Sequence, residues 1–463
     1  MILYLFYAAA LLILAAFVAA GTFIGRASTP RDYSLGGRKA SAAGVTGILL
    51  GALVGGASTV GTVQMAYSYG LTALWFTLGG GIGCLLLGLR FAVPLRNSGI
   101  TTVADYLAGS YGGSGSCGSA ISCTATISSS LGTFISICAQ FLSCIAMLRG
   151  IFPISPWCAS LLAALSILGF IAAGGLKSFS KLGEAKILLL YGALLACAGA
   201  AAARGGTPAA LASSLSFQPW FNLFGRGGWP ELGYLASMVV GIFTTQIYIQ
   251  SLAAAKDAAA ARAGAFASAL LMPPMGLLGA WIGLSVRARG VVMAPDKVLS
   301  WFIMDSFPPF LGGLIWGGIL ITVIGCAAGL VLGIATNIQK NLIPRGLAQK
   351  LKGRETLTGR LLVFVIVAAS AVLGVGGSGS MILEWSFHSM GLRGSGTFLP
   401  FAAAILRPGS IAPRWALAAS VGGLTGTLVW AACGLAGDPL FAGLAVSALC
   451  AAAGWLLRRG CRN

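Results

Sequence analysis

Three ionisable side chains occur within one apolar stretch, SMILEWSFHSMGLRGSGTFLPFAAAIL at residues 380–406. Glu384 and His388 are four residues apart and would share one face of a helix. His388, the only histidine, can accept a hydrogen bond or a proton. The alternative is that Glu384 lies near the outer surface and His388 only caps a kink. Arg393 suits a carboxylate ligand, unless it pairs with a carboxylate of the protein or extends to the surface.

Two other stretches combine glycines with small polar residues. The first is GVTGILLGALVGGASTVGTVQMAYSYG, residues 44–70, and the second is LGYLASMVVGIFTTQIYIQSLAAAKD, residues 232–257. The residues of interest are Gly51, Gly55, Gly56, Ser58 and Thr59 in the first, and Gly241, Thr244 and Thr245 in the second. A helix that unwinds at such a point exposes backbone groups that can bind a solute or an ion. Glycines alone also permit close helix packing, but the adjacent polar residues favour a binding site.

The composition identifies the elements that must position these residues. The chain is 57% hydrophobic and only 8% charged, with a mean hydropathy of +0.91. A water-soluble globule has about a quarter charged residues, so this is an all-α polytopic membrane protein with one domain, residues 1–463. The eleven cysteines lie mostly in apolar runs without metal-ligand spacing. We therefore expect neither a metal site nor a cofactor. We also expect that the protein is not an enzyme.

Spans of about 20 apolar residues predict thirteen transmembrane helices. Their expected ranges are 2–24, 42–68, 71–95, 119–149, 154–176, 180–203, 231–253, 258–287, 310–343, 358–378, 379–406, 412–434 and 437–458. The second and seventh spans are the two glycine-interrupted stretches, which suggests two five-helix halves that each open with a broken helix. The halves would cover 42–203 and 231–406, with one peripheral span at 2–24 and two at 412–458.

The net charge of +19 has a simple explanation in a membrane protein. Most of the 29 lysines and arginines fall on one side of the expected spans, with clusters at 26–39 and 340–360. The positive-inside bias then predicts an outside N-terminus and a cytoplasmic C-terminus in a plasma membrane. Nucleic acid is not an expected partner, because the basic residues bracket spans and do not cluster with aromatic residues.

Residues 33–80, YSLGGRKASAAGVTGILLGALVGGASTVGTVQMAYSYGLTALWFTLGG, resemble the sodium/solute symporter family. The segment TTQIYIQSLAAAKDAAAARAGAF is similar to a second family motif, although Ser251 stands where arginine is usual. The resemblance implies a leucine-transporter-like inverted-repeat fold, alternating access, and a solute held between spans 2, 3, 7 and 11. The positions that would line the solute cavity are Ser58, Trp75, Gln140, Ser237, Gly241, Thr244, Thr245, Phe387 and His388.

The resemblance also implies a sodium site, which this sequence lacks in part. The carbonyl ligands would come from Gly51, Val54 and Thr322, and the usual pair of hydroxyl ligands is replaced by Gly325 and Cys326. A thiol is a poor ligand for a hard cation. A carboxylate that family members carry near the ion route is replaced by Gly183, with Glu184 beside it.

Lys186 is a candidate substitute for the ion. It lies three residues after Gly183, about one helical turn along the same side of the sixth span. Its ammonium group could bind the carbonyl groups of Gly51, Val54 and Thr322, unless the side chain extends to the cytoplasmic surface. We expect transport that persists without sodium.

The sequence thus predicts a secondary transporter for a small polar organic solute, with carboxylates and amino acids as candidates. Sodium coupling, proton coupling and uncoupled transport all stay open. A membrane sensory module of the same fold is the alternative from another class, and an ion channel would need a continuous polar stripe that the spans do not show.

Overall fold

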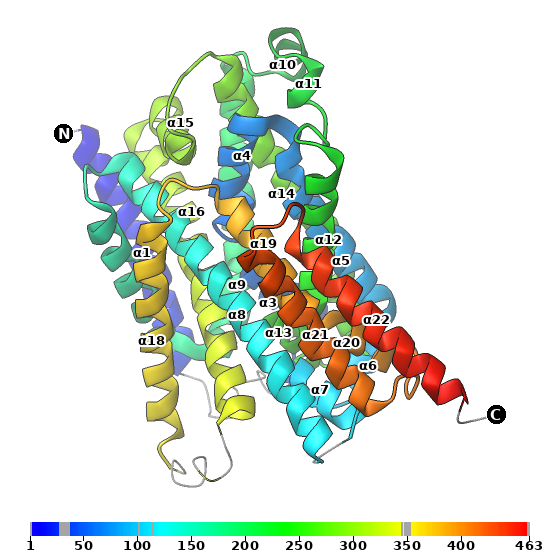
Figure 1. The fold of residues 1–463 in the computed structure, drawn as a ribbon. Coiled ribbons are helices and arrows are strands. Elements are labelled where there is room, and N and C mark those ends of the chain that lie inside the picture. The colour runs from blue at the N-terminus through cyan, green and yellow to red at the C-terminus, as the bar shows by residue number, and fades with distance from the viewer. Residues whose placement is uncertain are drawn as a thin grey trace.

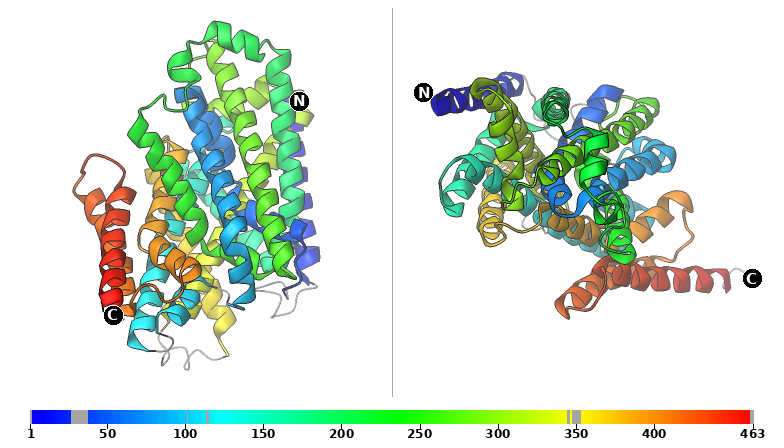
Figure 2. Two further views of the ribbon diagram at one scale, coloured as in Figure 1. Left: turned by 90° about the vertical axis from the view of Figure 1, so that its right-hand side faces the viewer. Right: turned by 90° about the horizontal axis from the view of Figure 1, so that it is seen from above.

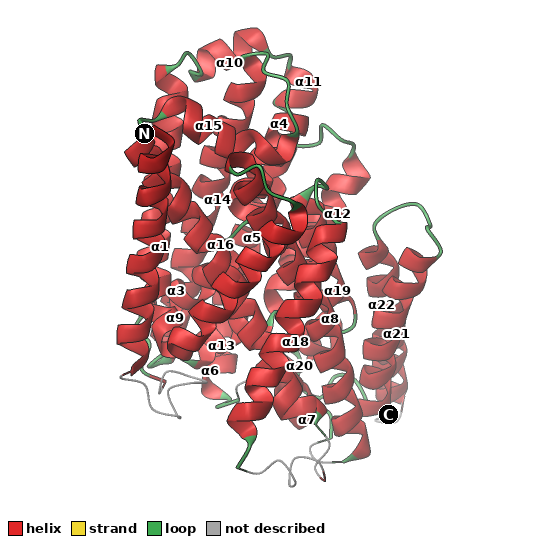
Figure 3. Ribbon diagram, turned by 90° about the vertical axis from the view of Figure 1, so that its left-hand side faces the viewer, coloured by secondary structure: helices red, strands yellow, loops and turns green. Residues whose placement is uncertain are grey.

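The computed structural model describes residues 2–26, 38–100, 102–112, 115–343, 346 and 353–460. Within these ranges the chain is helical, and β-structure is limited to one isolated bridge between Ala40 and Ala255 (Figure 3). The expected all-α fold is confirmed. The helices pack side by side in one bundle (Figure 1).

Helices occupy every expected span. Up to residue 203 the long helices and their parts are α1 (Ile2–Arg26), α3 (Ala42–Leu53), η2 (Ala57–Gly61), α4 (Thr62–Tyr69), η3 (Gly70–Leu74), α5 (Trp75–Leu86), η4 (Leu87–Phe91), α6 (Ala92–Asn97), α8 (Ser116–Ile151) and α9 (Pro156–Ala203). From residue 228 onward they are α12 (Gly228–Thr244), α13 (Gln246–Ala253), α14 (Ala258–Ala288), α16 (Pro309–Asn337), η6 (Ile338–Leu342), α18 (Glu355–Gly376), α19 (Ile382–Ser395), α20 (Phe398–Leu406), α21 (Pro413–Ala432) and α22 (Pro439–Gly460). Short connecting helices are α7 (Val103–Ser110), α10 (Pro208–Ser214), α11 (Phe217–Trp220), η5 (Pro295–Lys297) and α15 (Val298–Ser306).

The count of thirteen spans is not confirmed. Among the described residues, eight helices are long and apolar enough to cross a membrane, or nine if one bent pair is a single span. Several expected spans are divided into shorter helices. The fifth and sixth expected spans, 154–176 and 180–203, both fall within one helical element, α9. The side chains of residues 173–182 lie outside the described part.

Both predicted helix breaks are present. The first lies at residues 54–56, between the end of α3 and the π-helix η2. The second is a bend of 47° between α12 and α13, at Thr245. Close packing explains the glycine at the first break, because a methyl group on Gly56 would lie 2.0 Å from Ser143 Oγ in α8.

The broken helices lie within the bundle and peripheral helices surround them. The helix α3 packs against α9 and α14, and the helix α19 packs against α8 and α12. The pair α21 and α22 lies at one edge (Figure 2). The two ends of the chain lie at opposite ends of the bundle, as an odd number of crossings requires (Figure 1). Which of these ends faces the cytoplasm stays a prediction, and four basic residues of the clusters at 26–39 and 340–360 lie outside the described residues: Arg31, Arg345, Lys350 and Lys352.

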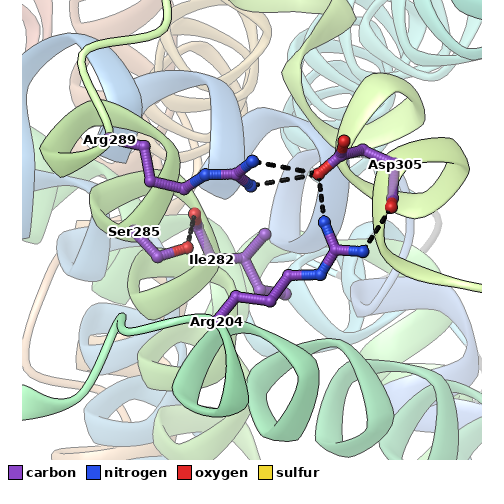
Figure 4. A network of polar contacts seen from close by, with 5 residues as sticks. All are labelled: Arg204, Ile282, Ser285, Arg289 and Asp305. Carbon is purple, nitrogen blue, oxygen red and sulfur yellow. Dashed lines mark hydrogen bonds and ion pairs between the residues drawn. The ribbon is translucent and has the colours of Figure 1, made fainter.

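An ion cluster joins three helix ends at the upper end of the bundle in Figure 1, which we call the outer end after the predicted orientation. The carboxylate of Asp305 in α15 accepts hydrogen bonds from Arg204 Nη1 at 2.5 Å and from Arg289 Nη1 at 3.1 Å (Figure 4). Arg204 follows α9 and Arg289 follows α14. This cluster holds the connecting helix α15 over the ends of two long helices.

Candidate functional site: two helix breaks with buried cations

The first break leaves backbone carbonyl groups at the end of α3 without helical partners, as at any helix C-terminus. Two side chains from other helices donate hydrogen bonds to these carbonyl groups. Lys186 Nζ in α9 donates to the Gly51 carbonyl at 2.6 Å, and Cys326 Sγ in α16 donates to the Ala52 carbonyl at 2.8 Å. An ammonium group is favoured at this position, because the C-terminal end of a helix carries partial negative charge.

Lys186 is buried, with 3% of its surface exposed, so the alternative in which it extends to the cytoplasmic surface is wrong. Its side chain lies beside Gly325. A methyl group added at Gly325 would be 3.7 Å from Lys186 Nζ and 3.6 Å from its Cδ. The ammonium thus lies next to the position where the family resemblance implies a hydroxyl ligand.

Other oxygen ligands implied by the resemblance are absent or occupied. The Thr322 hydroxyl donates to the Ile319 carbonyl of its own helix at 2.7 Å. Gly183 lies against the backbone of Gly47, and a Cβ atom at this position would be 2.3 Å from the Gly47 carbonyl oxygen. Glu184 is exposed and does not replace the missing carboxylate.

Gln140 and Ser58 stabilise the unwound backbone at this break. Gln140 Oε1 in α8 accepts a hydrogen bond from the Gly56 amide at 2.7 Å. The Ser58 hydroxyl donates to the Gly55 carbonyl at 3.1 Å, and Thr59 Oγ1 donates to the same carbonyl at 2.7 Å. Both predicted cavity residues therefore contact the break, and they hold its shape.

The second break faces a buried arginine. Arg393 Nη1 in α19 donates to Thr245 Oγ1 at 2.5 Å, and Nη2 donates to Ser389 Oγ at 2.6 Å. Ser389 in turn donates to the Gly132 carbonyl of α8 at 2.6 Å. The side chain of Arg393 is fully buried and has no ion pair among the described residues, which contradicts both alternatives given for it.

Aromatic side chains lie between the breaks and the outer end. Phe387 stacks on Tyr234 with ring centroids 4.1 Å apart and meets the edge of Phe76 at 5.9 Å. Trp75 Nε1 donates to the Leu223 carbonyl at 2.7 Å.

An ion pair lies beyond these rings. Arg226 Nη2 bonds Glu384 Oε1 at 2.8 Å, and its guanidinium lies 4.6 Å from the centre of the Tyr69 ring. Glu384 therefore lies near the outer end, as one of the two readings had it.

Three other residues that we predicted to line the cavity, Gly241, Thr244 and Ser237, are buried. Gly241 packs against Met390, where a methyl group would lie 2.5 Å from the sulfur atom. Thr244 is buried and bonds its own helix, and the buried Ser237 hydroxyl has no partner among the described residues.

His388 is exposed while its neighbours Phe387 and Ser389 are buried, so its expected place in the cavity is wrong. Ser389 and Arg393 share a buried face of α19, and His388 lies on a different side of the helix. Ser389 was missed, although it lies four residues before Arg393 on the same face. Tyr234 and Arg226 were also missed, since a loop arginine and an aromatic residue in a span carry no distinctive pattern.

Groups of three or more possible metal ligands do not occur among the described residues.

Comparison with known proteins agrees with this architecture. No curated protein matches the chain. Among solved structures, a Na+-coupled sialic acid symporter in a substrate-bound outward-open state shares 17% identity, covers 98% of this chain and 97% of its own, and has a TM-score of 0.77. An Eremococcus coleocola manganese transporter shares 13% identity over 91% of this chain and 92% of its own, with a TM-score of 0.49. The shared fold rests on the first of these structures.

The family model described as Sodium:solute symporter family matches residues 33–385, from the loop before the first broken helix into α19. That range includes both breaks, Lys186 and Cys326. The chain is a membrane transporter with the leucine-transporter-like fold, and it belongs to the sodium:solute symporter family.

Proposed function

We propose that this protein moves a small polar organic solute by alternating access and needs no sodium ion to do so. The observation that supports this proposal is the hydrogen bond of 2.6 Å from Lys186 Nζ to the Gly51 carbonyl. The ammonium supplies the positive charge that a bound cation would bring to the end of α3.

The chemistry of the first break supports the same conclusion. A hard cation prefers several oxygen ligands, and a site that lacks them binds it weakly. Here the carbonyl of Gly51 already accepts from an ammonium and that of Ala52 from a thiol. Gly325 and Cys326 contribute no side-chain oxygen atom. A sodium ion would have to displace Lys186 and would then meet an incomplete shell.

A fixed lysine changes how transport can be coupled. An ammonium cannot leave with the solute as an ion does, but it can lose its proton in a buried site. The proposal therefore includes two modes, uncoupled transport with a permanent ammonium and proton-coupled transport in which Lys186 titrates. The same proposal includes the predicted location of the protein in a plasma membrane and the predicted orientation, with the C-terminus in the cytoplasm.

The test uses the full chain reconstituted in proteoliposomes. Counterflow of a panel of labelled amino acids, carboxylates, sugars and nucleobases identifies a transported solute, and its uptake is then measured with sodium replaced by choline. We expect equal uptake in both media. A pH gradient applied without sodium separates the modes, because only proton coupling drives accumulation. A sodium-coupled family member reconstituted in parallel serves as the control.

Strict sodium dependence would contradict the proposal. No counterflow with any solute, from protein that remains folded, would favour the sensory module.

A further inference from the structure

The guanidinium of Arg393 keeps a full positive charge inside the bundle. It donates hydrogen bonds to the neutral hydroxyls of Thr245 and Ser389, and Tyr248 is a further neutral neighbour. Arg393 Nε is buried and has no partner among the described residues. A buried polar donor without a partner is costly, and a buried charge without a counter-charge costs more.

The acidic residues lie elsewhere. The ion pairs among the described residues involve Asp305 and Glu384, both at the outer end. The second buried cation, Lys186, also binds a neutral group, the Gly51 carbonyl. Among the described residues, the two buried cations beside the breaks thus form no ion pair with a carboxylate.

The position of Arg393 favours a ligand over a purely structural role. It meets α12 and α13 where they bend by 47°, at the point where backbone groups leave the helical pattern. The helix α13 begins there without a side-chain cap, so its N-terminal amide groups add positive potential. A guanidinium fork, an unused N–H group and a helix N-terminus are the groups that bind carboxylates in proteins.

We propose that Arg393 binds the carboxylate group of the transported solute, with Thr245 and Ser389 holding the guanidinium in position. This inference rests on the proposed function and adds a substrate class to it, an organic carboxylate. The loaded site then contains a neutralised Arg393, and a neutral analogue leaves the charge uncompensated. An inorganic anion such as chloride is the other source of negative charge, and the experiment separates the two.

The test measures ligand binding by the thermal stability of the purified full chain in sodium-free choline salts of fixed ionic strength. The probes are carboxylates with their own amides: acetate and acetamide, lactate and lactamide, benzoate and benzamide, succinate and succinamide, together with glycine and glycinamide. We expect at least one carboxylate to stabilise the protein where its amide does not. Its apparent Kd should rise about 30-fold or more in Arg393→Gln and less in Arg393→Lys. Arg414→Gln, which makes the same change at an exposed position, should bind as the wild type does.

Three results would overturn the inference: amides that stabilise the wild type as well as the acids do, chloride that stabilises it as strongly, or an unchanged Kd in Arg393→Gln. If Arg393→Gln does not fold, Thr245→Val and Ser389→Ala replace it, and each should weaken carboxylate binding about 5-fold or more by removing a hydrogen bond that orients the guanidinium. Unchanged binding in both contradicts the inference. Carboxylate binding that requires sodium would contradict the proposed function and leave this inference standing.

Discussion

At the scale of single residues, Lys186 lies in the crevice where the family resemblance implies ion ligands. Its ammonium reaches the Gly51 carbonyl from α9, its stem lies beside Gly325, and the neighbouring Cys326 thiol satisfies Ala52. The side chain that enters the crevice is therefore longer than the hydroxyls that are missing, and it comes from another helix. This arrangement makes the crevice a place where one substitution should have a large effect.

Lys186→Met should reduce solute uptake in choline medium about tenfold or more. Methionine fills most of the space of the lysine stem, but it leaves the Gly51 carbonyl without its donor and the end of α3 without its cation. Initial rates in proteoliposomes measure the effect. Lys297→Met, which removes an exposed lysine at the outer end, is the matched control and should transport normally. Normal uptake by Lys186→Met would show that the ammonium is dispensable.

The triple variant Lys186→Ala, Gly325→Ser and Cys326→Ser should acquire a response to sodium. A serine Cβ fits at position 325, because the nearest atom it would meet is 3.6 Å away and belongs to the lysine side chain that is removed. The change frees the Gly51 carbonyl and adds two hydroxyl ligands. Sodium at ten times its Kd would stabilise the variant by about 1.4 kcal/mol, which a thermal melt in sodium against choline detects. The wild type should show no difference, and equal melts for the variant would argue against this picture of the crevice.

The sequence predicted the polar residues at the breaks better than those on α19. Lys186 followed from helical spacing, since Gly183 fixed the side of the helix that faces α3. His388 did not, because α19 carries polar residues on more than one face and its inward side depends on the packing against α8 and α12. Ser389 holds the guanidinium only because the Arg393 side chain turns back along one helical turn and donates a hydrogen bond to it, which the sequence alone does not show.

At the scale of elements, the two breaks depend on how closely neighbouring helices approach. Gly55 lies against Cys326 and Gln140, where a methyl group would be 2.6 Å from an atom of each. Glycines beside polar residues therefore signalled these breaks correctly. The short helices α7, α10, α11 and α15 were not predicted, because hydropathy separates apolar spans from loops and says little about helices within a connection.

Gly56→Ala should destabilise the protein and impair transport. The added methyl group would lie 2.0 Å from Ser143 Oγ and 2.2 Å from Ser143 Cβ, which forces α8 away from the break. Overpacking of this kind costs about 1–3 kcal/mol. Gly192→Ala, at a glycine of α9 with open space around it, should melt as the wild type does.

A second substitution tests whether contact with α8 is the cause. Ser143→Gly removes both clashing atoms, so the double variant should recover most of the lost stability and uptake. A double variant as unstable as Gly56→Ala would instead indicate that another contact, such as Gln140 Oε1 at 3.2 Å from the added methyl group, is the cause.

At the scale of the whole molecule, the ion pairs among the described residues lie at the outer end, in two separate clusters. Arg226 bonds Glu384 and lies over Tyr69, which links the start of α12, α19 and the end of α4 above the aromatic layer. Arg204, Arg289 and Asp305 join α9, α14 and α15 (Figure 4). The first cluster lies above Phe387 and Tyr234, so in alternating access it must separate whenever the site opens outward.

Glu384→Gln should therefore favour the outward-open form. The pair that it weakens is partly exposed, with 22% and 33% of the Arg226 and Glu384 side chains accessible, so its contribution is about 1 kcal/mol. That corresponds to about a fivefold larger open population, and amide hydrogen exchange in residues 221–228 should accelerate by a similar factor. Asp305→Asn alters an ion cluster at the same end that does not cover the aromatic layer, and it should leave exchange in this segment unchanged. Equal acceleration in both variants would mean that the outer end loosens as a unit, and that the contact between Arg226 and Glu384 has no special part in closing the site.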